Sequence, residues 1–197
     1  MQLARPAIAL FAAASLISGC APLFIVGAAE TGRIVAQERP IGTAINDISA
    51  QADIESRLAS NSFKLFQHVA VRVIQGRVLL AGHVKDEEIR AQAGQLAGGV
   101  DNVREVNNEI TVGGGSIGSN LNDFRISSQM RTKLMADYKI SSVNYHVQTV
   151  DGTVFLLGVA RDEAELDRVA LHARTIAGVK KVVSYVQLKD DAGRREM

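Results

Sequence analysis

The chain has 197 residues, enough for one medium-sized domain or two small ones. Its hydrophobic content of 47% and charged content of 22% are typical of a folded protein and exclude an intrinsically disordered chain. There is no Trp, and only 5% of the residues are aromatic, so a core must be built from aliphatic side chains. The formal net charge is +1, so the chain as a whole does not attract nucleic acid and we expect no nucleic-acid partner.

The N-terminus has the layout of a secretory signal peptide, which we place at residues 1–19. Arg5 precedes an apolar run over residues 7–17, which is too short for a transmembrane helix. Residues 17–20 (ISGC) resemble the bacterial lipobox, in which the signal is removed and the cysteine is acylated. The alternatives are an ordinary signal peptide that contains a cysteine, or a buried N-terminal helix. We predict that Cys20, the only cysteine, carries the lipid.

Residues 20–46 are interpreted as a lipidated tether between a membrane and the first domain. The apolar part of this segment is too short to span a bilayer. Position 21 is Ala rather than the Asp that commonly retains enterobacterial lipoproteins in the inner membrane. We therefore expect a lipid anchor in the outer membrane, with the protein facing the periplasm.

An internal repeat fills most of the remaining chain. Residues 47–112 align with residues 123–188 at a constant offset and without a gap. Identical residues at corresponding positions include Asp47/Asp123, Leu58/Leu134, Val71/Val147, Gly76/Gly152, Leu80/Leu156, Asp86/Asp162, Ala97/Ala173 and Val106/Val182. The chain therefore contains two copies of one domain, with a Gly/Ser-rich linker over 113–122 and a charged tail over 189–197.

In the second copy, the spacing of apolar residues predicts a helix followed by a hairpin. Ile126, Met130 and Leu134 recur at the spacing of one helix face. Apolar residues then alternate on both sides of Asp151-Gly152, a pair that favours a tight hairpin turn. The same pattern appears in the first copy, around Gln75-Gly76.

A second helix and a last strand complete each copy. Asp162 is placed to cap this helix by accepting a hydrogen bond from a free backbone N–H, and Gly178 is expected to end it. The expected buried stripe of the helix is Leu166, Val169, Ala170, Ala173 and Ile176. Three strands with two helices on one face make a two-layer α+β domain.

The pattern α-β-β-α-β, with Gly at the hairpin and Asp at the start of the second helix, resembles the BON domain. Matching segments include residues 75–80 (QGRVLL), 106–110 (VNNEI) and 126–128 (ISS). The resemblance implies two tandem BON-like domains, each with a three-stranded mixed sheet packed on two helices. A lipobox followed by two such domains is similar to outer-membrane lipoproteins of this family.

The resemblance also implies a function. Such a protein is expected to be non-enzymatic, to need no cofactor, to bind an anionic phospholipid membrane and to support outer-membrane integrity. Recruitment to division sites and contact with the outer-membrane protein assembly machinery are implied as well. In the family, the first helix of the second domain meets lipid through an aromatic residue near its start. Here that position is Arg125, and the aromatic residue is the preceding Phe124.

The residues of that helix support a lipid contact independently. If Ile126, Met130 and Leu134 face the core, the opposite side mixes apolar and cationic groups, which suits a membrane surface. The predicted lipid face consists of Phe124, Arg125, Ser128, Arg131 and Met135. The alternative is that Phe124 and Met135 pack against the first domain.

Charge distinguishes the two copies. Residues 47–61 carry a net charge of −2, whereas residues 123–139 carry +2. Only the second helix is therefore expected to favour anionic lipid. The competing hypotheses are a protein–protein scaffold for assembly or division machinery, and an enzyme.

No residue pattern supports catalysis or a metal site. His68, His83, His146 and His172 share no metal-ligand spacing, and lipidation of Cys20 removes the only thiol. The recurring acidic pairs that begin at Asp86 and Asp162 are better explained by helix capping than by acid–base chemistry.

Overall fold

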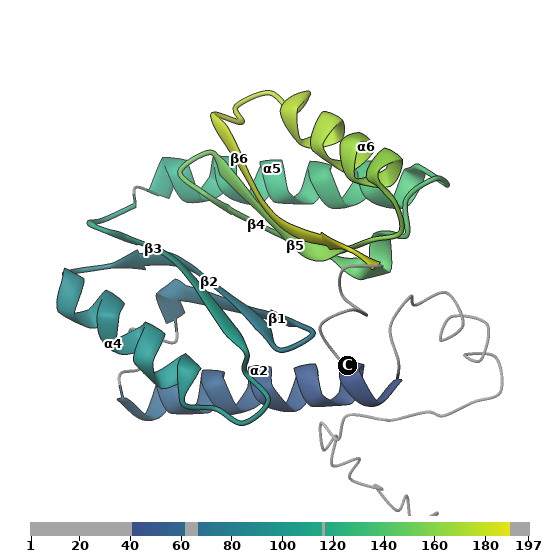
Figure 1. Cartoon of the computed structure of the whole chain (residues 1–197). Helices are drawn as coiled ribbons and strands as arrows, with labels where there is room; N and C mark the ends of the chain where they lie inside the picture. The colour runs from purple at the N-terminus through teal and green to yellow at the C-terminus, as the bar shows by residue number, and fades with distance from the viewer. Residues whose placement is uncertain (1–40, 62–66, 116, 190–197) are drawn as a thin grey trace, which may run out of the picture. The chain divides into compact units, whose positions relative to one another are not determined.

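The computed structural model describes residues 41–61, 67–115 and 117–189 (Figure 1). The predicted signal peptide, the lipidation site Cys20 and the tether up to residue 40 lie outside the described residues. So does the charged tail from residue 190 onward.

Both copies fold as predicted, in the order helix, two strands, helix, strand. The elements of the first copy are α2 (Ile41–Asn61), β1 (Val69–Ile74), β2 (Arg77–Val84), α4 (Glu87–Gly98) and β3 (Glu105–Val112). Those of the second are α5 (Ile117–Ala136), the short 3-10 helix η1 (Ser142–Asn144), β4 (Tyr145–Val150), β5 (Thr153–Ala160), α6 (Glu163–Arg174) and β6 (Lys181–Leu188). In each three-stranded sheet the first two strands are antiparallel and the last two are parallel, which confirms the mixed sheet.

The two helices of each copy cover one face of its sheet (Figure 1). The predicted stripe Ile126, Met130 and Leu134 of α5 is buried against β4, β5 and α6. Ala50, Ile54 and Leu58 occupy the corresponding places on α2. The 3.6-residue period of apolar residues therefore fixes which side of each helix remains outside.

Both first helices begin earlier than the repeat predicted. α2 starts at Ile41, inside the expected tether, and α5 starts at Ile117, inside the expected linker over 113–122. The repeat itself extends this far, because residues 41–47 (IGTAIND) match residues 117–123 (IGSNLND). A helix already nucleated by its buried face gains a hydrogen bond for each added residue, so Gly, Ser and Asn are tolerated in its first turns.

A buried aspartate joins each first helix to its hairpin. Asp123 is 6% exposed, and its two carboxylate oxygens accept hydrogen bonds from the backbone N–H groups of Asp151 (2.7 Å) and Gly152 (2.8 Å). Both turn residues have positive φ, which explains the glycine. Asp47 holds the turn at Gln75-Gly76 in the same way, at 2.8 and 2.9 Å. We call this arrangement the aspartate clamp.

The expected helix caps are partly confirmed. The side chains of Asp86 and Asp162 each accept a hydrogen bond from the backbone N–H three residues later. Gly178, however, does not end α6, which stops at Arg174 with Thr175 as its C-cap. Gly178 instead has φ of 90° in the turn that precedes β6. Its counterpart Asn102, with φ of 65°, lies in the matching turn of the first copy.

The second face of each sheet is also apolar, and the two sheets share one core. It contains Ile74, Leu79, Ala81, Val150, Phe155, Leu157 and Val159. Arg77 is buried at 5% exposure beside this core, and its guanidinium donates to the carbonyls of Tyr185 (2.6 Å) and Gly158 (2.9 Å). The Tyr185 hydroxyl contacts Glu109 of the first copy. Apolar packing and these polar contacts join the copies.

The aspartate clamp yields a stability prediction. Asp123→Ala leaves two backbone N–H groups of the β4–β5 turn without their acceptor, which should lower the free energy of unfolding by about 2–4 kcal/mol. Asp53→Ala, at an exposed site on α2, is the control and should change it by less than about 0.5 kcal/mol. Urea unfolding followed by circular dichroism measures both, and equal effects of the two substitutions would refute the clamp.

Candidate functional site

The outward side of α5 exposes large apolar side chains. Phe124 is 70% exposed and Met135 is 69% exposed, so neither packs against the first domain as the alternative supposed. Leu121, one turn before Phe124, is 68% exposed. At 100° per residue these side chains fall on the side of α5 opposite Met130, whose side chain is buried.

The cations of the predicted lipid face are partly occupied by internal hydrogen bonds. One Nη of Arg125 donates to the carbonyl of Ala177 (2.6 Å) and to the side chain of Asn122 (2.9 Å). Arg131 is exposed, and one of its Nη atoms donates to the carbonyl of Val147 (3.0 Å). Arg125 therefore ties α5 to the loop after α6, whereas the exposed guanidinium of Arg131 keeps donors toward solvent.

Ser128 contributes less than expected, because its side chain is only partly exposed and its carbonyl accepts a hydrogen bond from Thr132 (3.0 Å). All five predicted residues belong to α5, but the structure places Phe124, Arg131 and Met135 outermost. We call these three residues together with Leu121 the α5 outer face.

Both acidic residues of the helix region are withdrawn from solvent. Asp123 is buried in the aspartate clamp. The side chain of Asp137, just after α5, is 8% exposed, and it binds Arg168 (2.6 Å) and His172 (2.8 Å) of α6. The net charge of +2 counted from the sequence therefore understates the positive charge that this region presents outward.

The first copy shows which of these features are shared. Ile45 and Ile48 of α2 correspond to Leu121 and Phe124, and they are 61% and 71% exposed. The position of Arg131, however, is taken by Glu55. Exposed apolar side chains thus occur on both first helices, and the sign of the surrounding charge is what separates them.

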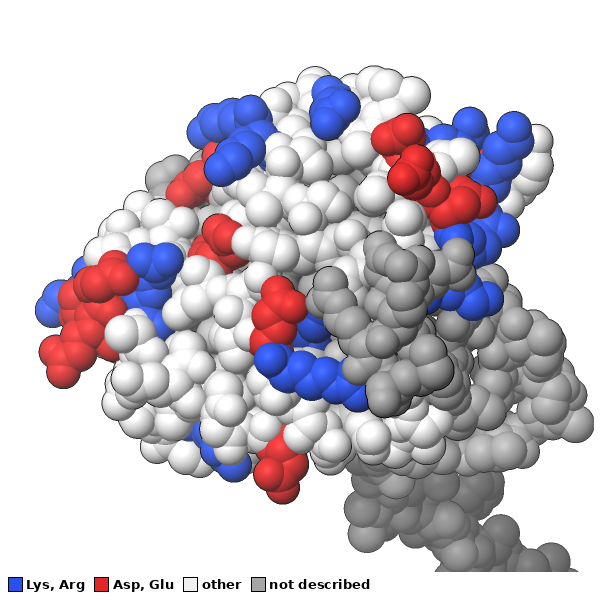
Figure 2. Space-filling view, viewed as in Figure 1, with Lys and Arg blue, Asp and Glu red and all other residues white. Residues whose placement is uncertain are grey.

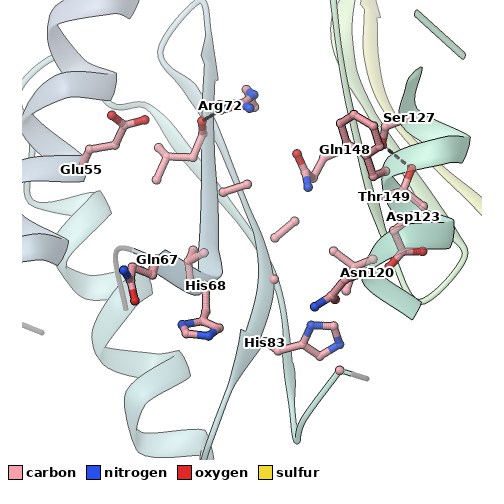
Figure 3. A pocket seen from close by; sticks show the side chains of 18 of the residues that line it. Glu55, Gln67, His68, Arg72, His83, Asn120, Asp123, Ser127, Gln148 and Thr149 are labelled. Carbon is pink, nitrogen blue, oxygen red and sulfur yellow. Dashed lines mark hydrogen bonds between the residues drawn. The ribbon is translucent and has the colours of Figure 1, made fainter. Parts of the chain in front are cut away.

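A groove adjoins the α5 outer face. Figure 3 shows Glu55 and Arg72 on one wall and Gln148, Ser127 and Thr149 on the other. Burial lowers the pKa of the Arg72 guanidinium, the nearby charge of Arg131 lowers it further, and Glu55 opposes both effects. Two arginines therefore border the groove beside the helix.

Two polar side chains that line the groove are engaged by neighbouring side chains. The hydroxyl of Ser127 donates to Thr149 (2.8 Å), and His83 lies 2.7 Å from the carboxylate of Asp151. Within residues 41–61, 67–115 and 117–189, no group of three or more His, Cys, Asp or Glu is placed to hold a metal ion. Over the same ranges, no helix has the length and apolar content needed to cross a bilayer.

Charged side chains of both signs lie on the face drawn in Figure 2. On the face shown in Figure 2, basic and acidic side chains lie interspersed rather than gathered by sign. A charged partner therefore needs a local patch, such as the one beside α5.

Comparison with known proteins gives the family. The family model described as "BON domain" matches residues 46–114 and 122–190. The chain belongs to the BON-domain family. The two matches coincide with the two copies, and the second begins at the last residue before Asp123.

Two relatives match 92% and 67% of the chain. It is 30% identical over 183 residues to the outer membrane lipoprotein DolP of Haemophilus influenzae, covering 92% of this chain and 94% of that protein. It is 40% identical over 139 residues to an uncharacterized protein of Anaplasma centrale, covering 67% and 92%. The C-terminal domain of CdsD, from the type III secretion system of Chlamydia trachomatis, gives a TM-score of 0.30 at 18% identity, covering 72% of this chain and 66% of that one.

Two exposed residues near the predicted lipid face were missed in the sequence. Leu121 fell within the expected linker, although the match between residues 41–47 and 117–123 would have placed it on the helix. Tyr138, which is 88% exposed, follows the end of α5 at Ala136. No signal in the sequence indicated that its ring would point to solvent.

The Asp137 cluster of the second BON domain gives a pH prediction. The hydrogen bond with His172 is the main cause that lowers the pKa of Asp137 from 3.8 to about 2, helped by the backbone N–H of Lys139 and by Arg168 against the effect of burial. Because the pKa is lower in the folded state, the ionised carboxylate stabilises the fold above about pH 4, and this contribution is lost as the pH falls toward 2.

Asp137→Asn should therefore be less stable than the parent near neutral pH, and the difference should shrink as the pH approaches 2. The urea midpoint measured across this range checks the effect. Asp167→Asn, on the exposed side of α6, is the control and should show a small difference at every pH. A gap for Asp137→Asn that does not change with acid would contradict the assignment.

Proposed function

We propose that this chain is a non-enzymatic outer-membrane lipoprotein that binds anionic phospholipid through α5 of its second BON domain and supports outer-membrane integrity. Lipidation of Cys20 anchors the chain, which faces the periplasm. The observation that carries the lipid-binding role is the exposure of Phe124 and Met135 beside Arg131, while the carboxylates of both acids of the region accept internal hydrogen bonds.

The envelope location is supported by two features. Residues 1–20 have the order of cation, apolar run, small residues and cysteine that a lipoprotein signal requires. The relative with 30% identity over nearly the whole chain is itself named an outer membrane lipoprotein. Several acyl chains on Cys20 hold such a protein at the bilayer, because each buried methylene contributes about 0.8 kcal/mol.

The chemistry of the α5 outer face suits the surface of an anionic bilayer. Phe124 and Met135 can enter the boundary between head groups and acyl chains, where apolar side chains leave water. Arg131 then lies at the level of the phosphates, and a basic residue near an anionic surface contributes about 1 kcal/mol. Asp123 is buried and Asp137 is paired with Arg168 and His172, so neither acid of this helix region presents a free carboxylate that would oppose the attraction.

A protein–protein scaffold for outer-membrane protein assembly or division machinery is the second candidate. It is favoured by Ile45 and Ile48, which are exposed on α2 near the exposed acid Asp53 and the partly exposed Glu55. An anionic membrane repels such a helix, whereas a protein with a complementary surface does not. Binding that requires anionic lipid supports the first function, and lipid-independent capture of a membrane-protein partner supports the second.

The charge prediction uses a matched pair of arginines. Arg131 on α5 and Arg57 on α2 are both exposed, and each donates one hydrogen bond to a backbone carbonyl. The Cys20→Ser full chain is sedimented with phosphatidylcholine vesicles, with and without phosphatidylglycerol. Arg131→Glu should lower the gain in affinity that phosphatidylglycerol provides by about 10- to 30-fold, and Arg57→Glu by less than about twofold.

The readout is the difference in affinity between vesicles with and without phosphatidylglycerol, because the apolar segment 7–17 contributes to binding of both kinds of vesicle. The Arg131 effect should also diminish as salt is raised. An unchanged phosphatidylglycerol dependence in Arg131→Glu would overturn the proposed lipid site.

The apolar prediction uses a matched pair at the same repeat position. Phe124 and Ile48 are 70% and 71% exposed, so neither supports a core. Phe124→Ala should weaken binding to anionic vesicles about five- to tenfold, because less apolar surface enters the membrane. Ile48→Ala should leave it unchanged. Equal losses in the two variants would mean that the helices do not differ in lipid contact.

A further inference from the structure

The loop that follows α5 exposes an aromatic ring. Tyr138 is 88% exposed, more than Phe124 or Met135. It lies two residues beyond Ala136, the last residue of the helix, and Val143, after the loop, is 50% exposed. Residues 137–141, which we call the Tyr138 loop, therefore extend the apolar exposure of the α5 outer face beyond the helix end.

Hydrogen bonds and ion pairs fix the residues on both sides of Tyr138. Asp137 binds Arg168 and His172 of α6, and its second carboxylate oxygen accepts the backbone N–H of Lys139 (3.1 Å). The next residue, Ile140, is 6% exposed, and its N–H donates to the carbonyl of Asp137 (2.9 Å). The backbone that carries Tyr138 is therefore fixed in position.

A buried glutamate secures the far end of the Tyr138 loop. Glu165 of α6 is 2% exposed and accepts hydrogen bonds from the N–H of Ser141 (2.7 Å) and from Nε of Arg161 (2.7 Å). The same arginine donates through another nitrogen to the carbonyl of Lys139. Burying a charged carboxylate requires such compensation, so this site is built to hold the loop.

These supports belong to the second copy alone. The positions of Arg168, His172 and Glu165 are occupied in the first copy by Gln92, Leu96 and Ile89. The position of Asp137 is Asn61 there, and that of Tyr138 is Ser62. The second copy therefore combines the exposed aromatic residue with the ionic network that fixes its loop. Neither feature is part of the pattern that the two copies share.

The charge beside Tyr138 and the chemistry of its side chain suit contact with an anionic bilayer. Lys139 Nζ lies 5.9 Å from the centre of the tyrosine ring, and the charge of Asp137 is enclosed by its partners. A tyrosine has an apolar ring and a polar hydroxyl, a combination that settles at the interface between head groups and acyl chains. A neighbouring lysine meets the phosphates at the same depth.

We propose that the Tyr138 loop is a second membrane contact, in which the ring of Tyr138 enters the head-group layer of an anionic bilayer and Lys139 binds a lipid phosphate. The inference rests on the proposed function and extends it beyond α5. The held backbone contributes because a loop whose main chain is already fixed loses little backbone entropy on binding.

The absence of Trp from the chain makes the test specific. Tyr138→Trp in the Cys20→Ser full chain introduces one fluorophore at the loop. Vesicles that contain phosphatidylglycerol should shift its emission to shorter wavelengths and protect it from iodide, and lipids brominated near the head group should quench it. Leu171→Trp, on α6 at a site 60% exposed, is the control and should not respond.

Binding measurements complete the test. Tyr138→Ala should weaken binding to anionic vesicles about three- to fivefold, because its ring no longer enters the membrane. Leu171→Ala should leave binding unchanged, and both variants should unfold at the parent temperature because both side chains are exposed.

If vesicles do not change the emission wavelength of the Tyr138→Trp variant, or shift it no more than that of Leu171→Trp, the inference is overturned. If Arg131→Glu and Phe124→Ala still weaken binding in that case, lipid contact by α5 stands and only the loop is excluded. If the parent chain shows no preference for anionic vesicles, the proposed function and the inference both fail.

Discussion

The aspartate clamp determines how each domain presents its first helix. A single carboxylate on α2 or α5 accepts both N–H groups of the tight turn between the first two strands. Because it is buried and doubly hydrogen-bonded, it fixes the helix in rotation as well as in position over the sheet. Which side chains of α5 point outward therefore follows from Asp123 at one end and the buried stripe of Ile126, Met130 and Leu134 along its length.

The same interaction affects the electrostatics of the surface. An aspartate that serves the clamp no longer contributes its charge outside, and Asp137 is removed in a different way, by α6. In the first domain, by contrast, Asp53 remains exposed and Glu55 partly so. Two helices of common origin thus differ at their surfaces more than their residue counts suggest, and the difference concerns sign rather than apolar content.

Much of the fold follows from local patterns in the sequence. The duplication, the two hairpins, the capping aspartates and the buried stripe of α5 all rest on residue spacing, and the structure contains each of them. The start of α5 at Ile117 was not predicted, because composition suggested a linker, whereas continuation of an established helix depends on tertiary packing. The end of α6 at Arg174 was missed because Gly178 serves a turn instead.

The candidate site was predicted only in outline. Periodicity placed Phe124 and Met135 outside the core, but it could not show that Arg125 is engaged by the carbonyl of Ala177. Nor could it show that Glu165, in an exposed-looking helix start, is buried beneath the loop that carries Tyr138. Both contacts join segments far apart in the chain, and hydrophobic spacing contains no information about them.

Arg77 shows how far the two copies have diverged from interchangeable units. Its guanidinium reaches carbonyls of the other domain, while the corresponding residue of the second copy is Thr153. The contact between the sheets is therefore asymmetric, because the first domain supplies the guanidinium donor and the second supplies the carbonyl acceptors. The first domain without its neighbour would expose an apolar sheet face to water, and Arg77 would lose those two carbonyls, so each domain completes the core of the other.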